Sequence, residues 1–393
     1  MKKHYDIIIV GAGPSGLSTA LHFDHFAKVQ EKSILILEKA RHPRPKLCAG
    51  GILVEGERVL AKLGLDLCEV PHVDVDRALF NYKGHGLVAR FFNKKPIFRT
   101  VRRNEFDAWL ANKVKERDIE IQEETTVIKV ESFDDYALVK TNEGEFHAKV
   151  VVGADGSNSK VRASVAKSKR PHVGRALEVI TPVRSTSQAT PTQPSPARGG
   201  LSVASFDFHP VPNGISGYLW DFPAKIDGEP MRCWGIYDSN IVKRKERVPL
   251  RQILAEEMAE SGYDLDDYEL KGHPIRWYDA GNQASAPRVI LVGDALGVDA
   301  LLGEGISPAL GYGRIAAEEI LRAFEKDDFS FRGYGERLLR SRLGGALWRR
   351  TFIAKIFYRL NTSSWQRIIW HYFSWLAGLL GAIFVVGWEK KEK

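Results

Sequence analysis

A glycine-rich turn near the N-terminus has the composition and spacing of a dinucleotide-binding site. The apolar, strand-like run 5–10 is followed at once by Gly11, Ala12, Gly13, Pro14, Ser15 and Gly16. In such a G-x-G-x-x-G pattern the first glycine permits a tight turn, the second lets the backbone approach a pyrophosphate, and the third lets helix and strand pack closely. The following helix would present unpaired N–H groups to the phosphates. A glycine turn that serves only packing is the alternative.

An acidic residue at the end of the next strand narrows the choice of dinucleotide. Glu38 follows Gly16 by 22 residues and stands near the end of the strand-like stretch 33–39, with Lys39 beside it. A carboxylate at this place accepts hydrogen bonds from a ribose and disfavours a 2′-phosphate. We therefore expect Glu38 and Lys39 to contact NAD or FAD rather than NADP.

Two later stretches, 148–152 and 288–292, are apolar and strand-like. Each is followed within a few residues by an aspartate, Asp155 after the first and Asp294 after the second. Ligands of open α/β sheets bind at the carboxyl ends of the strands, so both segments are candidate cofactor contacts. Asp294 ends the second strand at that edge of the sheet and is therefore a candidate cofactor contact. Asp294 could instead cap a helix. A second glycine fingerprint is absent from the sequence, so an electron donor would have to bind transiently.

These three motifs, in this order, resemble those of the glutathione-reductase-like FAD superfamily, in the branch of aromatic hydroxylases and geranylgeranyl reductases. The resemblance implies FAD, with Asp294 at its ribityl and phosphate region and Asp155 near its pyrophosphate. It also implies cofactor contacts from Gly156, Gly303, Gly305 and Ile306. Residues 103–107 match the Arg-x-x-Phe-Asp pattern of a helix that touches the cofactor, which implies a contact from Arg103. Val127, at the start of a strand-like segment, is expected to line the same site. Arg103 could otherwise be a surface charge.

Two further segments look like those of the geranylgeranyl reductases. Residues 46–51 resemble the Cys-x-Gly-Gly segment beside the flavin ring, which implies a catalytic place for Cys48, Gly50 and Gly51. Residues 217–223 are similar to the Tyr-x-Trp-x-Phe-Pro strand that lines the lipid cavity of that family. Its candidate substrate residues are Tyr218, Trp220 and Phe222. Alternating positions on a strand share one face, so these three could equally be ordinary core, and Cys48 could be a small buried residue.

The order of the elements predicts an α/β fold with a discontinuous first domain. A strand, glycine turn, helix and strand open a doubly wound sheet, and the nucleotide-type signals return late in the chain. Between them lie strand-like segments rich in aromatic residues, which favour an antiparallel sheet, and a polar loop at 185–200. We expect a Rossmann-type FAD-binding domain of residues 1–70, 97–170 and 271–330, with an inserted antiparallel-sheet substrate domain of residues 71–96 and 171–270.

The basic charge of the chain is concentrated at its C-terminus. The formal net charge is +8, and residues 331–393 contain twelve Lys and Arg against three Glu. The same region holds the run 368–388, which has no acidic residue, Lys or Arg, and Lys390, Lys391 and Lys393 follow it. As one helix this run would reach about 30 Å, the thickness of a bilayer core. Basic and apolar residues together favour a membrane partner over nucleic acid.

We therefore expect residues 331–393 to form a basic helical region with a membrane segment at 368–388. That segment could span the bilayer, lie in the interface, or pack on the body as a hairpin. Residues 346–360 place Arg349, Arg350, Lys355 and Arg359 among aromatic and aliphatic residues, which is typical of a helix at a lipid surface.

The sequence as a whole predicts an FAD-dependent reductase of carbon–carbon double bonds in a membrane isoprenoid. A transient NAD(P)H or ferredoxin donor would supply electrons, and we expect no metal. An odd number of scattered cysteines and an N-terminus unlike a secretory signal favour a body on the cytoplasmic, reducing side of a membrane. The alternatives are an FAD-dependent monooxygenase acting on a quinone-like lipid and a non-catalytic flavin-binding membrane subunit.

Overall fold

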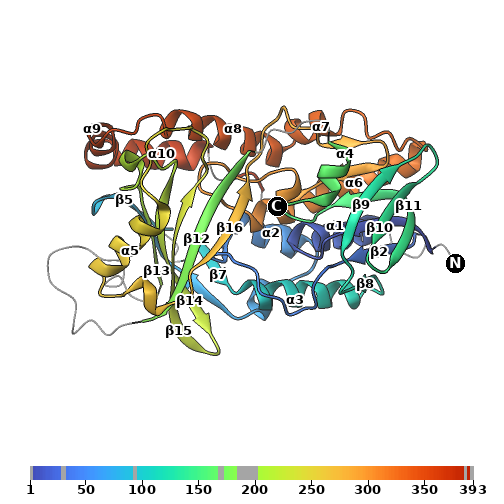
Figure 1. Ribbon diagram of the computed structural model, residues 1–393, viewed down its shortest axis with the longest axis horizontal. Coiled ribbons are helices and arrows are strands. Elements are labelled where there is room, and N and C mark those ends of the chain that lie inside the picture. The colour runs from blue at the N-terminus through green and yellow to red at the C-terminus, as the bar shows by residue number, and fades with distance from the viewer. Residues whose placement is uncertain are drawn as a thin grey trace.

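The computed structural model describes residues 3–27, 32–91, 95–166, 172–183, 202–384 and 387–389. Two sheets stand at opposite ends of an elongated molecule, and the C-terminal helices run along one side from the first towards the second (Figure 1). The loop expected at 185–200 and the terminal lysines Lys390, Lys391 and Lys393 lie outside the described residues.

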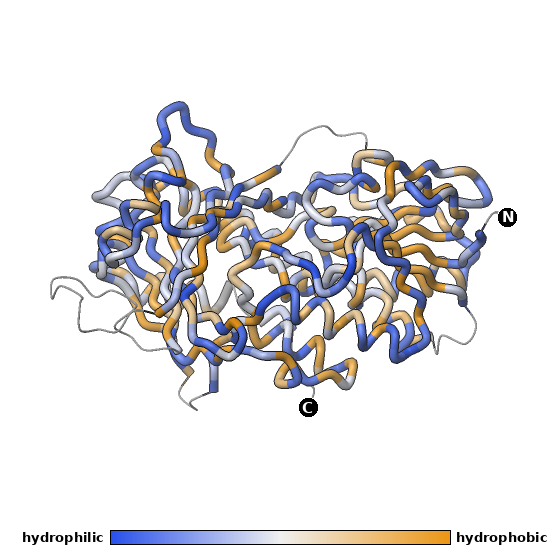
Figure 2. The backbone as a smooth tube through the Cα atoms, turned by 60° about the horizontal axis from the view of Figure 1, so that its bottom comes forward, coloured by the Kyte–Doolittle hydropathy of each residue, from blue (hydrophilic) through white to orange (hydrophobic). Residues whose placement is uncertain are grey.

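The first sheet is the nucleotide-type sheet that the N-terminal motif predicts. Its strands, in spatial order, are β17 (Ser285–Ala286), β18 (Val289–Leu291), β11 (Gly144–Gly153), β1 (Lys3–Val10), β2 (Ile34–Leu37) and β8 (Glu120–Gln122). From β18 to β8 neighbouring strands run parallel. These strands are apolar because helices cover them, and those beside the N-terminus are hydrophobic along most of their length (Figure 2).

Helices and an antiparallel extension complete this half. α1 (Pro14–Ala27) packs along α6 (Ile306–Lys326), where the Ser18 hydroxyl donates a hydrogen bond to the Leu310 carbonyl at 2.7 Å. α3 (Arg103–Lys115) packs against α1. β9 (Val127–Ser132) and β10 (Ala137–Thr141) pair as a meander with β11, and α4 (Lys160–Val165) lies against β9.

The second sheet has one face for packing and one for a cavity. Its order is β16 (Lys271–Arg276), β12 (Val173–Pro182), β15 (Glu229–Asp238), β14 (Gly217–Ile226), β13 (Val203–Asp207), β5 (Arg77–Tyr82) and β6 (His85–Ala89). Described neighbours are antiparallel except for the parallel pair β13–β5. α5 (Leu250–Glu260) covers the face that carries Leu219, Trp234 and Ile236. Because side chains alternate along a strand, Tyr218, Trp220 and Tyr237 point the other way.

A small sheet joins the two halves. It consists of β3 (Gly51–Leu53), β7 (Phe98–Val101) and β4 (His72–Val75), and α2 (Val54–Lys62) follows β3 directly. The domain boundaries expected from the sequence stay a prediction. The second sheet nevertheless takes in residues 271–276, beyond the boundary expected at 270, because β16 pairs with β12.

The C-terminal region is helical, but the run 368–388 is not one helix. α7 (Tyr334–Arg340) and α8 (Arg342–Phe357) are followed by α9 (Ser363–Arg367), the π-helical turn η8 (Ile368–Tyr372) and α10 (Ser374–Phe384). Across the described residues, no helix combines the length and apolarity needed to cross a membrane. The helical run breaks at Phe373, between η8 and α10, and the expected membrane segment stays a prediction.

Tertiary contacts hold this broken segment onto the body. Trp370 is buried and stacks on Phe208, with ring centres 4.7 Å apart. Trp388 is buried against Gly311 of α6. The Glu389 carboxylate forms an ion pair with Lys62 of α2, with 2.7 Å between the oxygen and the nitrogen. These contacts bury aromatic surface of the C-terminal segment at two separate points of the body.

Candidate active site

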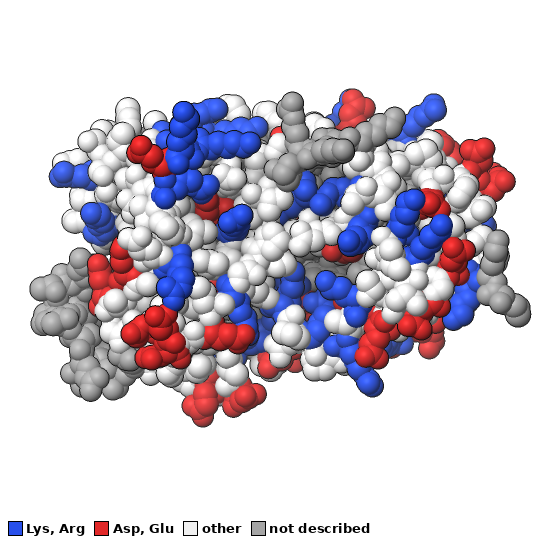
Figure 3. All heavy atoms as spheres, viewed as in Figure 1, with Lys and Arg blue, Asp and Glu red and all other residues white. Residues whose placement is uncertain are grey.

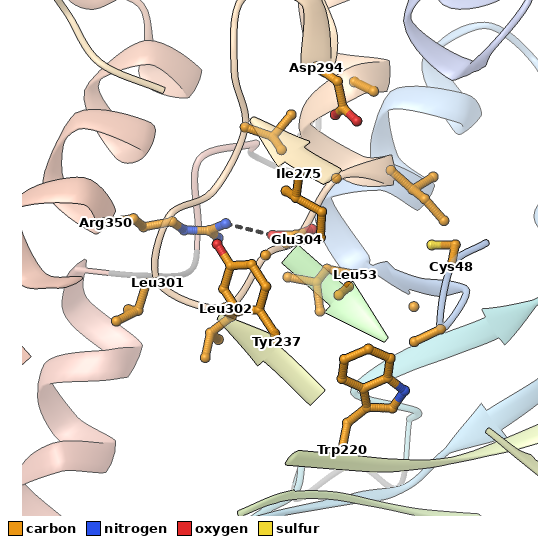
Figure 4. A pocket seen from close by; sticks show the side chains of 18 of the residues that line it. Cys48, Leu53, Trp220, Tyr237, Ile275, Asp294, Leu301, Leu302, Glu304 and Arg350 are labelled. Carbon is orange, nitrogen blue, oxygen red and sulfur yellow. Dashed lines mark hydrogen bonds and ion pairs between the residues drawn. The ribbon is translucent and has the colours of Figure 1, made fainter. Parts of the chain in front are cut away.

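One cavity of about 1900 Å³ connects the two halves. It begins at the glycine turn, passes Cys48 and Asp294, runs along β14, and reaches the C-terminal helices. The close-up in Figure 4 shows Cys48, Trp220, Asp294 and Tyr237 around its middle part. Its volume exceeds the roughly 300–1,000 Å³ of a usual small-molecule pocket, so it has room for more than one ligand.

The three glycines of the turn have different surroundings. Gly11 has a φ of +105°, and a Cβ there would lie 2.5 Å from the Ala154 carbonyl oxygen. A Cβ on Gly16 would lie 2.0 Å from the Gly11 oxygen, so this glycine serves close packing. At Gly13 the nearest protein atom to a built Cβ is Nη2 of Arg44, at 3.7 Å. The open space at Gly13 is what a pyrophosphate approaching the backbone requires.

Glu38 holds the glycine turn in shape. Its buried carboxylate accepts hydrogen bonds from the backbone N–H groups of Ala12 at 2.8 Å and Ala40 at 3.1 Å. Arg44, which the sequence interpretation missed, lies 3.4 Å from both Glu38 and Asp107. The Nε atom of Arg44 is buried and lies 3.4 Å from a Glu38 oxygen without a hydrogen bond, while Nη2 is the atom nearest to Gly13, so the guanidinium brings positive charge beside the glycine turn.

The second and third motifs are joined by an arginine. Arg162 donates hydrogen bonds to the carbonyl oxygens of Ser157 at 3.0 Å and Ala295 at 2.9 Å, and the Ser157 hydroxyl donates to Asp294 at 3.2 Å. The Oδ2 atom of Asp155 accepts from two backbone N–H groups at the start of α4. Its Oδ1 atom is buried without a partner in the described part of the chain, and burial raises the pKa of this carboxyl.

The Cys48 segment forms a half-buried wall of the cavity. Gly50 has a φ of +79° and a built Cβ would lie 2.0 Å from the Val101 oxygen, which explains the glycine there. The Gly50 N–H contacts the Cys48 sulfur at 3.4 Å, and burial raises the pKa of this thiol. Cys48 is therefore a neutral thiol at pH 7. Arg103 lies next to it and makes two hydrogen bonds of 2.8 Å to Asp107.

A lysine and a histidine meet on the same wall. The Nζ atom of Lys46 lies 2.6 Å from Nε2 of His273. Burial lowers the pKa of Lys46 to about 8 and that of His273 to about 4. A neutral His273 therefore accepts a hydrogen bond from a charged Lys46 at pH 7.

Aromatic side chains line the chamber beyond Cys48. Trp220 packs over Gly235, where a built Cβ would lie 2.1 Å from the indole ring, and its Nε1 has no partner among the described residues. Phe222 lies 4.9 Å from Phe206 and 5.4 Å from Phe98, measured between ring centres. Such a wall offers an apolar chain much contact surface and few polar groups.

Tyrosines and an arginine hold the loop between Asp294 and α6. The hydroxyls of Tyr218 and Tyr358 each donate to a loop carbonyl at 2.6 Å, to those of Leu302 and Leu301. Arg350 of α8 is 1% exposed and pairs with Glu304 at 2.6 Å, as the dashed line in Figure 4 shows. The expectation that Arg350 faces lipid is wrong, because its charge satisfies a buried carboxylate.

The far end of the cavity opens among exposed apolar side chains, which we call the mouth. The mouth residues, exposed and lining the cavity, are Trp348, Phe352, Ile356, Trp365, Ile368, Phe373, Leu376 and Leu380. Arg359 and Arg367 are exposed nearby in the sequence. On the face drawn in Figure 3, basic side chains gather over the C-terminal helices with few acidic ones among them.

The chain matches known flavoprotein sequences and folds. A family model described as an FAD binding domain matches residues 4–193. An uncharacterised protein of Methanosarcina barkeri is 28% identical, covering 91% of this chain and 84% of its own length. Digeranylgeranylglycerophospholipid reductase of Methanosarcina mazei is 25% identical, with coverages of 84% and 78%. The chain is an FAD-dependent oxidoreductase similar to the geranylgeranyl reductases.

The fold of this flavoprotein agrees with the sequence matches. A geranylgeranyl bacteriochlorophyll reductase-like protein of Thermoplasma acidophilum superposes with a TM-score of 0.74 at 19% identity, covering 94% of this chain and 91% of its own. The residues present also fit FAD. The open Gly13, the partnerless Asp155 oxygen and the Arg44 guanidinium provide space, an acceptor and a positive charge where the dinucleotide would bind.

Sequence reasoning placed nearly all of its candidates in one cavity. Every candidate cofactor, catalytic and substrate residue lines it except Gly16, which packs beneath the turn. Their individual roles in the flavoprotein stay predictions. The cavity also contains Arg44, Glu178, Tyr237, His273 and Arg350, which sequence reasoning did not identify as site residues. Alternation along β15 places Tyr237 on the same face of the sheet as Tyr218. No local sequence pattern marks the other four residues as part of the cavity.

Proposed function

We propose that this flavoprotein reduces carbon–carbon double bonds in the prenyl chain of a membrane lipid. The observation that carries the proposal is the single cavity that joins the nucleotide-binding turn to an aromatic chamber and an exposed apolar mouth. A prenyl chain has no polar group along its length, so only an extended apolar wall can hold it. The names of the curated relatives, which include reductases of a digeranylgeranyl lipid, support the same chemistry.

FAD bound at the glycine turn would, when reduced, supply a hydride. Isolated alkenes accept hydride poorly, so the contribution of the protein is to position the double bond and to exclude water. Trp220 and Phe222 would fix the chain against β14, while Cys48 and the two glycines that follow it would form the surface over which the double bond lies. A transient NAD(P)H or ferredoxin donor would restore the reduced cofactor.

A single-turnover experiment tests this function against its alternatives. The FAD-loaded protein is reduced chemically without oxygen and mixed with vesicles that contain a geranylgeranyl ether phospholipid. We expect reoxidation of the flavin together with a lipid product heavier by two hydrogens. A monooxygenase would instead add oxygen only when air is admitted, and a non-catalytic subunit would give neither product.

Replacement of Cys48 by alanine tests the position of the reactive surface. We expect Cys48→Ala to keep FAD and to slow alkene reduction at least tenfold, a barrier change of about 1.4 kcal/mol. Cys68→Ala is the control, because Cys68 is an exposed thiol outside the lining of the cavity. If both variants turn over at the wild-type rate per flavin, Cys48 serves packing alone.

We also propose that the C-terminal helices attach the protein to the cytoplasmic surface of a membrane. The mouth residues and their neighbours expose large apolar side chains beside basic ones, the composition of a helix that lies in a lipid interface. A lipid substrate could then enter the cavity from the bilayer without crossing water. This attachment needs no helix that spans the membrane.

Two exposed residues of α10 allow a test that spares the cavity. Trp375 is 64% exposed, Leu379 is 50% exposed, and neither lines the cavity. Burial of each side chain in lipid contributes roughly 1.5–3 kcal/mol, so we expect Trp375→Ser with Leu379→Ser to weaken vesicle binding at least tenfold. The measurement is flotation with vesicles containing phosphatidylglycerol, alongside turnover of a short prenyl alcohol, which should not change.

Ile128→Ser is the control for this experiment, because Ile128 of β9 is 59% exposed and lies far from α10 (Figure 1). Equal flotation of the double variant and the control would show that α10 does not contact lipid.

A further inference from the structure

Glu178 is a buried carboxyl group on the reactive wall. It lies on β12 between Gly235 of β15 and Lys271 of β16, and it is 4% exposed. Its side chain lines the cavity, together with Cys48 and Trp220. The Oε2 atom has no hydrogen-bond partner among the described residues, so the fold does not use this oxygen.

The groups around Glu178 do not neutralise it. Arg102 ahead of α3 and Lys271 of β16 favour its charged form from a distance, and the Cys48 backbone and the Cys233 thiol add hydrogen bonding. Burial outweighs these contributions and raises the pKa of Glu178 to about 7. No ion pair to Glu178 is found in the described part of the chain. A buried acid that is unpaired and half protonated near pH 7 has the properties of a proton donor.

Other titratable groups in the cavity are less suited to this role. Glu304 is paired with Arg350, and Asp155 is bound to the start of α4. Lys46 is held by His273, and burial raises the pKa of the Cys48 thiol above its ordinary value, which makes it a weaker acid. Glu178 combines cavity access, a free oxygen and a position on the wall of Cys48.

We propose that Glu178 donates the proton in the alkene reduction. This proposal rests on the function proposed above. FAD bound at the glycine turn would, when reduced, supply the hydride and would thereby be oxidised. One alkene carbon receives that hydride and the other receives the carboxyl proton of Glu178. The O–H bond of Glu178 breaks as the new C–H bond forms, and the alkene is thereby reduced. Water then returns a proton to the carboxylate, so the net reaction consumes one hydride and one proton.

The proton must be present on Glu178 before the reaction, so the reduction step should be fastest below pH 7. Above about 7 the protonated fraction falls, and the rate of product formation should fall tenfold for each further pH unit. In Glu178→Gln, which has no titrating proton, we expect a step at least tenfold slower and without this pH dependence. FAD content and chemical reduction of the flavin should not change.

Glu257→Gln is the matched control. Glu257 of α5 is half-buried and its pKa is also raised to about 7 by loss of solvation, but it lies outside the cavity lining, 3.7 Å from His209. We expect this variant to keep the wild-type rate and pH profile. Infrared titration gives a readout that is independent of turnover. In the wild-type protein, the infrared band of protonated carboxyl groups should lose intensity near pH 7. In each variant, this loss of intensity should be smaller by the contribution of one carboxyl group.

The outcomes separate this proposal from the function on which it rests. Wild-type rate and pH profile in FAD-loaded Glu178→Gln would overturn the role of Glu178 while leaving alkene reduction in place. No reduced lipid from the wild-type protein would overturn both. Should Glu178→Gln fail to bind FAD, Glu178→Asp carries the test. It keeps a carboxyl, so a shifted but persistent fall of rate with pH supports the proposal, and an unshifted profile contradicts it.

Discussion

Gly13→Val is expected to abolish FAD binding while leaving the fold intact. A Cβ at Gly13 would meet only the end of the flexible Arg44 side chain, at 3.7 Å, so the protein itself has room for valine. The valine methyl groups would occupy the space in which a pyrophosphate approaches the backbone. We expect no yellow flavin in the purified variant and no rise of Tm on adding FAD, which stabilises the wild-type protein by binding only its folded state.

Gly335→Val of α7 is the control, because a Cβ there would meet only Ala284, at an ordinary 3.5 Å. It should bind FAD as the wild type does. The apo forms of the Gly13→Val variant and the wild type should unfold at the same temperature. Stoichiometric flavin in Gly13→Val would contradict the assignment of the glycine turn to FAD.

Arg350→Ala is expected to have the largest effect on stability. Arg350 is almost completely buried and lies 2.6 Å from Glu304 and 3.4 Å from Asp299. Its removal would leave two buried carboxyl groups without a positive partner, which typically costs about 3–5 kcal/mol of unfolding free energy. Urea unfolding of the FAD-loaded protein measures this loss, and the variant should also bind FAD more weakly because Glu304 lies in the loop before α6.

The loss should depend on pH in a defined direction. Burial already raises the pKa of Glu304 in the folded protein, and without Arg350 it would rise further. A carboxyl with a raised pKa contributes its stability at low pH and loses it as pH rises through the folded pKa. Arg350→Ala should therefore be least damaging in acid, and adding Glu304→Gln should restore part of the stability.

Arg340→Ala provides the comparison. Arg340 pairs with Glu336 on the exposed face of α7, and a surface pair of this kind contributes little. Equal unfolding free energies for the Arg350 and Arg340 variants would show that the buried pair does not hold the loop.

The sequence alone predicted FAD as the cofactor, and the residues it predicted to hold FAD line one cavity, except Gly16. Gly11, Gly13, Asp155 and Asp294 each follow an apolar strand within a few residues, so their places depend on local rules of strand, turn and helix. Parallel strands bring such turns to one edge of the sheet. The alternation of Tyr218, Trp220 and Phe222 likewise predicted a common face, and the structure places all three on the cavity.

Only the tertiary structure showed which charged residues are buried, because their partners are distant in the sequence. Arg350 and Glu304 are 46 positions apart, and the residues that surround Glu178 come from separate elements. Neither residue stands in a pattern that local spacing could reveal. In the sequence Arg350 belonged to a basic, aromatic stretch typical of a lipid surface, while its burial depends on how α8 packs over the loop.

The sequence of the apolar run 368–388 likewise does not determine how the run packs. Its composition suits a spanning helix, an interfacial helix or a packed hairpin, because each buries the same side chains, in lipid or in protein. Trp370 and Trp388 pack on Phe208 and Gly311, whereas Trp375 and Leu379 stay exposed, so the run packs on the body at two points and its contact with lipid stays a proposal. Local sequence sets which surfaces must leave water, whereas the surfaces that cover them come from distant parts of the chain and are known only once it has folded.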